Sequence, residues 1–163
     1  MKIIYIHHAL RQKGSKNPQD DGIKKIGKKD AKVVAKILKE AQSNNLNIKA
    51  IYSSPFNRCI KTSKIINKYI KLNIIEESRF NEFKSIENET WTDLQNRVRE
   101  ALYDIICKYK ENESVVCVTS GVNVVAFISL VYKLEPSENT PFIGIPSCSP
   151  IIFEINKENF KLS

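Results

Sequence analysis

Short apolar segments alternate along this chain with longer segments in which apolar residues recur at helical spacing. Apolar runs of roughly four to eight residues that are bounded by polar loops are typical of buried strands. The pattern predicts strands at Met1–Ile6, Asn47–Tyr52, Leu72–Glu76, Val115–Thr119 and Pro150–Ile155, the last of them at or near a sheet edge.

Between these strands, the spacing of apolar residues predicts amphipathic helices. They cover Lys24–Ser43, a segment from Ser53-Ser54-Pro55 to about Lys71, Thr92–Tyr109, and a segment from about Asn123 to Lys133. The second helix is expected to begin with a hydroxyl cap and a proline, a common start signal. The predicted buried stripe of the first helix consists of Ile26, Ala31, Val34, Ala35, Leu38 and Ala41.

This alternation predicts an α/β fold with a mostly parallel central sheet and helices on both faces. A chain of 163 residues, of which 42% are hydrophobic, is long enough for one sizeable core and short for two. We therefore expect a single domain over residues 1–163, without repeats or linkers.

The chain is basic, with 26 lysines and arginines, 18 acidic residues and a formal net charge of +8. Only five of the basic residues are arginines, and the lysines are spread through the predicted helices. Nucleic-acid-binding faces usually combine arginines with interleaved aromatic residues. We therefore interpret most lysines as solvated helix faces and expect no nucleic-acid partner. The positive charge favours an anionic small-molecule ligand.

The sequence contains four cysteines without Cys-x-x-Cys spacing, no secretory leader and no apolar run of membrane length. These features favour a reduced, cytoplasmic protein with no membrane partner. Packing is the expected role of the cysteines, and Cys148 in the turn-like segment 146–150 is the one candidate for a reactive thiol. Adjacent strand residues face opposite sides, so His7 and His8 are not expected to share a metal ion, and no cofactor is expected.

His7 and His8 are the only histidines, and they directly follow the first predicted strand. Imidazole titrates near neutral pH, which makes a histidine at this position a candidate nucleophile or base. In a parallel sheet, the loops that follow the strands open at one edge, which brings the histidines near Arg58 and Thr119-Ser120-Gly121. An arginine in the first turn of a helix suits phosphate binding. Alternatively, Arg58 pairs with a surface carboxylate.

Several of these segments resemble the motifs of the histidine phosphatases, the superfamily of phosphoglycerate mutase and acid phosphatase. Residues 51–62, Ile-Tyr-Ser-Ser-Pro-Phe-Asn-Arg-Cys-Ile-Lys-Thr, are similar to the second motif of that family. Residues 4–9 resemble a strand ending in Arg-His-Gly, and residues 21–31 resemble the Leu-Thr-x-x-Gly segment. Residues 79–82 are similar to the stretch with the acidic residue, and residues 115–126 to a strand ending in Ser-His-Gly. The resemblance covers nearly the whole chain and implies a three-layer αβα sandwich.

The resemblance also implies a mechanism for phosphomonoester hydrolysis. His8 would attack phosphorus and form a phosphohistidine, which water then hydrolyses. Arg58 would hold the phosphoryl oxygens, and Glu82 would serve as general acid and base. The rivals for the role of Glu82 are Glu76, Glu77, Glu87 and Glu89. The implied ligand is phosphate or a phosphorylated small molecule. Mutase activity is less expected because the chain lacks the long insertions of the mutases.

Three positions depart from the pattern of the family. His7 occupies the position of the arginine before the nucleophile, Ala9 that of the glycine after it, and Ser120 that of the second catalytic histidine. Loss of one preorganised donor typically slows catalysis by about a hundredfold to a thousandfold. We therefore expect a weak or narrow phosphatase, or alternatively a module on the same scaffold that binds a phosphorylated ligand without turnover.

Other residues could complete the predicted phosphate site. Arg11 or Lys13 could replace the missing arginine, and a protonated His7 could restore a positive charge. The predicted phosphate-binding set is therefore His7, Arg11, Ser120 and Gly121, beside the catalytic candidates His8, Arg58 and Glu82. The apolar last strand could also pair across a homodimer.

Overall fold

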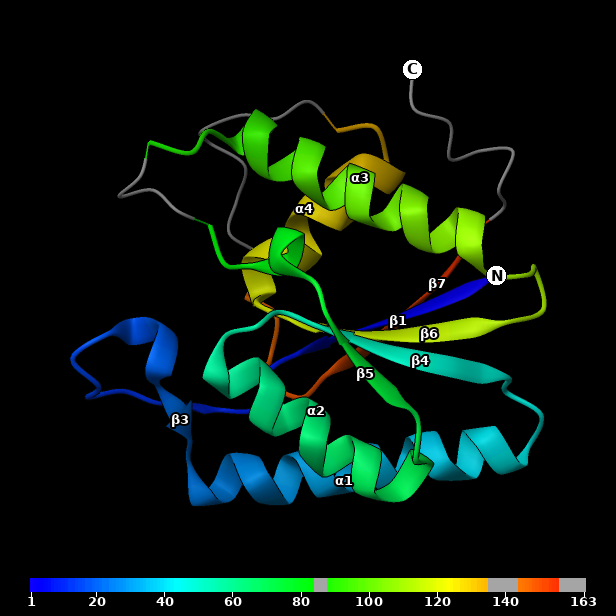
Figure 1. The fold of residues 1–163 in the computed structure, drawn as a ribbon, viewed down its shortest axis with the longest axis horizontal. Coiled ribbons are helices and arrows are strands. Elements are labelled where there is room, and N and C mark those ends of the chain that lie inside the picture. Colours follow the sequence, from blue (N-terminus) through cyan, green and yellow to red (C-terminus); the bar gives the residue numbers. More distant parts are fainter. Residues whose placement is uncertain (84–87, 135–143, 156–163) are drawn as a thin grey trace.

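The computed structural model describes residues 1–83, 88–134 and 144–155 (Figure 1). Its central sheet has the strand order β5-β4-β6-β1-β7. The strands are β1 (Lys2–His7), β4 (Ile48–Ser53), β5 (Asn73–Glu76), β6 (Ser114–Thr119) and β7 (Pro150–Glu154). The helices are α1 (Lys25–Ser43), α2 (Asn57–Ile70), α3 (Trp91–Lys108) and α4 (Gly121–Val131).

The sheet is mostly parallel, as the alternation of strands and helices predicts. The strands β5, β4, β6 and β1 run parallel to their neighbours, whereas β7 pairs antiparallel with β1 at the edge of the sheet. The edge position of the last strand is therefore confirmed. Because the four parallel strands share one direction, the carboxyl ends of β1, β4 and β6 meet at the same edge.

Helices cover both faces of the sheet, which gives the expected three layers. In Figure 1, α3 and α4 lie above the sheet, and α1 and α2 lie below it. Two clusters of buried apolar side chains fill the spaces between the layers. One contains Leu94, Leu102 and Phe127 from the α3 and α4 side, and the other contains Val34 and Ile66 from the α1 and α2 side.

Some local features differ from the prediction. The helix α2 begins at Asn57 after the N-cap residue Phe56, which makes no side-chain cap, so the predicted hydroxyl cap is wrong. Ser53 instead ends β4, and Ser54 Oγ accepts a hydrogen bond from the Phe56 N–H at 3.3 Å. In α1, Ile26 is 53% exposed and lies outside the buried stripe, since Gly27 is the residue that packs inward.

Four short elements have no counterpart in the predicted pattern, because two or three residues produce no measurable periodicity. The strands β2 (Arg11–Gln12) and β3 (Gly22–Ile23) pair as a small antiparallel ribbon beside the site described below. The short 3-10 helices η1 (Pro18–Asp20) and η2 (Ser78–Phe80) shape the loops near it. Across the described residues, no helix combines the length and the apolar character needed to span a membrane.

Candidate active site

His8 lies just past the carboxyl end of β1, where the sheet holds the backbone. Its N–H donates to the Thr119 carbonyl of β6 at 2.9 Å, continuing the parallel pairing of His7 with Thr119. The side chain is 5% exposed. The four residues from Ile3 to Ile6 are completely buried in the sheet, so the position of this imidazole is fixed by the sheet rather than by a mobile loop.

The hydrogen bonds of His8 assign its two ring nitrogens. Nδ1 lies 2.9 Å from the Ala9 carbonyl oxygen, which can only accept, so Nδ1 carries the proton. The Nε2 lone pair then accepts a hydrogen bond from Arg58 Nε at 3.0 Å. Burial lowers the pKa of His8 to about 3, an effect that the hydrogen bond to Ala9 opposes and that the electrostatic influence of His7, Arg58 and Arg11 reinforces. The imidazole is therefore neutral at pH 7 and has a nucleophilic nitrogen.

Arg58 connects the histidine to the rest of the site. It is 1% exposed and extends from the first turn of α2. Its three guanidinium nitrogens donate to different partners: Nε to His8, Nη1 to the Pro18 carbonyl at 3.1 Å, and Nη2 to Glu82 Oε2 at 2.5 Å. The guanidinium carbon also lies 4.8 Å from the centre of the Phe56 ring. The alternative of a pair with a surface carboxylate is borne out in part, because Arg58 pairs with Glu82, whose side chain is 36% exposed, although the guanidinium itself is buried.

Glu82 is the acidic candidate that the structure brings to Arg58. Its side chain is 36% exposed, so it contacts both the buried guanidinium and solvent. The rivals lie elsewhere: Glu77 binds Arg79, Glu89 binds Arg97, and Glu76 is exposed at the end of β5. Glu87 lies outside the described residues.

His7 stacks edge-on against His8, with ring centres 4.5 Å apart. Its Nδ1 lies 2.7 Å from the Ile145 carbonyl, so Nδ1 carries the proton and Nε2 carries a lone pair. Burial lowers the pKa of His7, an effect that the Ile145 carbonyl and Glu82 oppose and Arg58 reinforces. In the neutral form His7 thus offers Nε2 as an acceptor, whereas an arginine offers charged donors.

Gly121 and Ser120 form the start of α4 beside His7. A side chain on Gly121 would begin 3.4 Å from Cε1 of His7, so the ring lies directly against this helix end. Ser120 is the N-cap residue, 2% exposed, and its Oγ accepts from Asn123 Nδ2 at 3.0 Å. Because Asn123 Nδ2 also donates to the Asn81 carbonyl at 2.8 Å, Asn123 orients its nitrogen toward both partners. The Ser120 hydroxyl proton is left available to donate.

Arg11 occupies a different place from the one predicted for a replacement donor. Its Nε donates to Asp21 Oδ2 at 2.5 Å, within the β2–β3 ribbon. The Ser15 N–H and Arg11 lower the pKa of Asp21 to about 2, so this carboxylate stays ionised and holds the arginine. Arg11 acts on the site through space, by lowering the pKa of His8. Lys13 is exposed and has no ion-pair partner among the described residues.

Thr62 was part of the resembling motif, but its role could not be read from the sequence. Its Oγ1 accepts from the Ala9 N–H at 3.0 Å and donates to the Arg58 carbonyl at 2.7 Å. This hydroxyl therefore joins α2 to the loop after His8. The role of Asn123 also escaped the sequence, because an asparagine in an apolar helix gives no signal of its partners.

The remaining questions from the sequence are whether Cys148 is a reactive thiol and whether the chain holds a metal ion. Burial raises the pKa of the Cys148 thiol to about 12, which favours the packing role over a reactive one. Its N–H donates to the His7 carbonyl at 2.9 Å, so it supports the backbone of the site. Among the described residues, no group of three or more histidines, cysteines or acidic residues is arranged to hold a metal ion.

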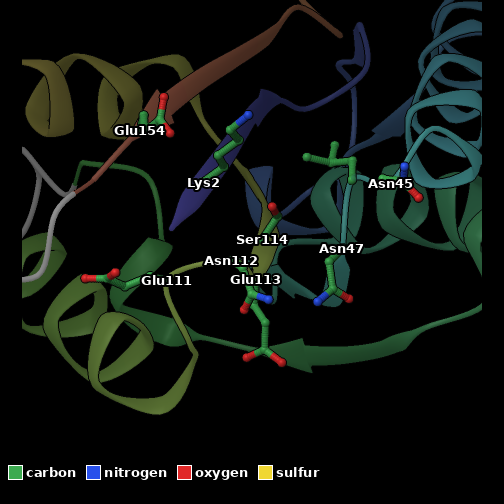
Figure 2. Close-up of a pocket in the computed structure, with 9 residues that line it drawn as sticks. Lys2, Asn45, Asn47, Glu111, Asn112, Glu113, Ser114 and Glu154 are labelled. Carbon is green, nitrogen blue, oxygen red and sulfur yellow. The ribbon is translucent and has the colours of Figure 1, made fainter.

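Two hollows of the surface differ in their relation to this site. One of about 410 Å³ is lined by Gln19, Asp20, Pro55, Phe56, Asn57, Ile60, Glu76 and Asn81, and the Phe56 ring also lies beside the Arg58 guanidinium. The other, of about 220 Å³, lies where β1 and β6 begin, at the opposite end of the sheet (Figure 2). Lys2, Asn47 and Glu113 line this second hollow, and Glu113 already pairs with Lys49. His8, Arg58 and Glu82 line neither of these two hollows.

Comparison with known proteins identifies the family to which the chain belongs. Residues 8–87 and 83–163 match the histidine phosphatase superfamily (branch 1). The chain therefore belongs to the histidine phosphatase superfamily, as a divergent member. No curated protein matches its sequence.

Solved structures share this fold at low sequence identity. YhfR of Bacillus stearothermophilus is 18% identical, with a TM-score of 0.75 over 95% of this chain and 91% of that chain. A mycobacterial glucosyl-3-phosphoglycerate phosphatase in complex with VO3 is 17% identical, with a TM-score of 0.74 over 93% and 90%. The phosphoglycerate mutase of Plasmodium falciparum is 22% identical, with a TM-score of 0.60 over 82% and 76%. These similarities show the phosphoglycerate mutase-like α/β fold.

Proposed function

We propose that this protein hydrolyses phosphomonoesters of small molecules through a phosphohistidine on His8. The observation that carries the proposal is the contact of 3.0 Å between His8 Nε2 and Arg58 Nε, with Glu82 on the same guanidinium. These residues are distant in the sequence and meet at the edge where an α/β sheet places its ligands. The site thus combines a neutral nucleophile, a cation for the phosphoryl oxygens and a carboxyl group.

In the first step, the lone pair of His8 Nε2 attacks phosphorus and the bond from phosphorus to the ester oxygen breaks. Glu82 acts as the general acid and gives a proton to the leaving oxygen, which departs as an alcohol. Arg58 must move its N–H groups from His8 and Glu82 to the phosphoryl oxygens, where they balance the transferred charge. His8 Nδ1 keeps its proton throughout and donates it in a hydrogen bond to the Ala9 carbonyl, which holds the ring in place.

In the second step, Glu82 accepts a proton from water as the water oxygen attacks the phosphohistidine. The bond from phosphorus to Nε2 breaks, and its electron pair returns to His8. Inorganic phosphate leaves, and both His8 and Glu82 are restored to their starting states. No metal or cofactor enters either step of this proposal.

A second candidate function is phosphate binding without turnover. It is favoured by one specific observation, namely that His7 offers a lone pair on Nε2 where an arginine would donate. Ser120 is in the position of a second histidine and is also uncharged. The site therefore has a neutral group at both position 7 and position 120. Each missing charged donor is expected to slow phosphoryl transfer by about a hundredfold to a thousandfold.

Hydrolysis of para-nitrophenyl phosphate distinguishes these two functions. We expect slow release of phosphate by the wild-type protein, no release by His8→Gln, and strong loss with Arg58→Gln. The matched control is Arg99→Gln, which removes the same charge from α3 far from His8 and should leave the rate unchanged. The double substitution His7→Arg with Ser120→His should raise the rate by at least a hundredfold.

The opposite results would remove the enzymatic proposal. If wild type and His8→Gln release phosphate at equal rates, the activity does not arise at this site. If wild type shows no turnover yet binds inorganic phosphate, and His8→Gln or Arg58→Gln weakens that binding, the module without turnover is correct.

A further inference from the structure

The solvent side of α1 carries an unexpected row of apolar side chains. Ile26, Val33 and Ile37 are 53%, 57% and 50% exposed. Their spacing of seven and four residues places them in one stripe along the helix. The buried stripe of α1 is a different one, formed by Gly27, Ala31, Val34, Ala35 and Leu38. Single exposed apolar residues are ordinary, but an aligned row of three calls for an explanation.

Lysines lie directly beside this apolar row. Six exposed lysines follow one another around α1, namely Lys25, Lys28, Lys29, Lys32, Lys36 and Lys39. At about 100° per residue, they occupy a sector of about 100° next to the row. Within the described residues, none of the six has a carboxylate within 4.0 Å, the limit for an ion pair. The helix contains only two acidic residues, Asp30 and Glu40, so its net charge is strongly positive.

In contrast to the expectation from the sequence that the protein has no membrane partner, we propose that this face of α1 binds an anionic membrane surface. A helix that lies on a bilayer has basic residues near the lipid phosphates and apolar residues in the interface, which is the pairing seen here. No residue of α1 lines either of the hollows described above, so this face suits a flat surface better than an inserted peptide. A second copy is disfavoured because it would bring two lysine-rich faces together.

The position of α1 is compatible with an accessible active site. In Figure 1, α1 lies along the lower edge of the molecule, with the sheet above it. Its amino-terminal end adjoins the loop after His8, since the Lys24 N–H donates to the Leu10 carbonyl at 2.8 Å. A membrane against the outer face of α1 would therefore lie beside the site rather than over it. The proposal does not depend on the proposed phosphatase activity.

Co-sedimentation of the full-length protein with lipid vesicles tests the proposal. We expect binding to vesicles of phosphatidylcholine with about one third phosphatidylglycerol, and none to phosphatidylcholine alone. Replacing Lys29, Lys32 and Lys36 by Gln should weaken binding about fivefold for each lysine and about a hundredfold in total. The triple variant Ile26→Ser, Val33→Ser and Ile37→Ser retains all charges and should also weaken binding at least tenfold.

The matched control removes three exposed lysines from α2, namely Lys61, Lys64 and Lys68, each replaced by Gln. It has the same net charge as the α1 lysine variant and should bind vesicles almost as wild type does. Circular dichroism verifies that each variant is folded. Absence of wild-type binding to the anionic vesicles overturns the proposal. Equal losses in the α1 and α2 lysine variants, or wild-type binding by the serine variant, overturn it as well.

Discussion

His7 and His8 are neighbours in the sequence, and both donate from Nδ1 to a backbone carbonyl. The same arrangement has opposite consequences for the two residues. For His8 it directs the Nε2 lone pair to the site, which a nucleophile requires. For His7 it places a lone pair where an anion would need a donor. A bound anion is therefore expected to favour protonated His7, whose Nε2 then becomes a donor.

This linkage predicts that anion binding strengthens as pH falls. The pKa of His7 in this structure lies below 6.5, because burial disfavours the charged form. Since a bound anion stabilises the proton on His7, affinity for sulfate should rise by up to tenfold per pH unit as the pH falls through the pKa of His7 in the complex, and level off below its pKa in the free protein. Sulfate suits the measurement, for example by calorimetry, because it keeps its charge in this range.

The variant His7→Arg isolates the contribution of this histidine. Arginine stays charged, so sulfate should bind more tightly at pH 7.5 and lose most of its dependence on pH. Glu82 and Arg58 also face His7, but they are unchanged in the variant, and the pKa of His8 at about 3 lies outside the window. An equal pH dependence in both proteins would show that another group is responsible.

The bond between Asn123 and Ser120 gives a second prediction for single residues. Because Asn123 Nδ2 occupies the Ser120 oxygen, the hydroxyl proton is directed away and can donate to an anion. Hydrogen bonds to charged groups are worth about 1.5–3 kcal/mol, so Ser120→Ala should weaken phosphate binding by about tenfold to a hundredfold. Asn123→Ala should cause a loss of the same direction, and the double variant should lose little more than Ser120→Ala alone.

The control for this double-mutant cycle is a measurement of the thermal stability of each variant. Asn123 also binds the Asn81 carbonyl, so its removal is expected to lower the melting temperature. If Asn123→Ala lowers stability but leaves phosphate affinity unchanged, the asparagine has only a structural role. Fully additive losses in the double variant would show that the two side chains act independently.

At the scale of elements, α2 positions the site through its first two turns. Arg58 extends from the first turn, and Thr62 one turn later binds both the Arg58 carbonyl and the Ala9 N–H. Thr62 thereby fixes the position of the loop after β1 relative to α2, the helix after β4. The distance between His8 and Arg58 depends on this junction as well as on the sheet.

Removing the Thr62 hydroxyl should therefore affect both stability and activity. Thr62→Val keeps the shape of the side chain but leaves the buried Ala9 N–H without a partner, which is expected to cost about 1–3 kcal/mol. Urea denaturation would measure this loss. Thr62→Ser retains the hydroxyl and should preserve the phosphatase rate, whereas Thr62→Val should reduce it. Equal stability of the Val and Ser variants would contradict the role assigned to this hydroxyl.

The elements themselves were largely predictable because hydrophobic periodicity depends on residues near one another in the sequence. The predicted helix over Lys24–Ser43 differs from α1 by one residue at its start. The exposure of Ile26 could have been predicted, because at about 100° per residue it lies roughly 130° from the centre of the buried stripe and shares a face with Val33 and Ile37. The start of α2 was misplaced because serine and proline also occur in the turn before a helix, as they do here.

At the scale of the whole molecule, the convergence of His8, Arg58 and Glu82 was predictable because parallel strands open at one edge and the motif resemblance selected the residues. The sequence could not predict the ion pair of Arg11 with Asp21, since Arg11 lies in β2 and Asp21 directly precedes β3, two strands too short to show periodicity. The sequence also could not predict whether Nε2 of His7 accepts or donates a hydrogen bond. That choice depends on the Ile145 carbonyl, which is 138 residues away in the chain.

The central claim is that His8 accepts a phosphoryl group. The most direct test is rapid acid-free quenching of the protein with a ³²P-labelled aryl phosphate, followed by mass spectrometry of the labelled peptide. The account predicts an acid-labile, alkali-stable phosphoryl group on His8, which Glu82→Gln should preserve for longer because water is less well activated. Turnover without any label on His8, or a label on another residue that persists in His8→Gln, would contradict it.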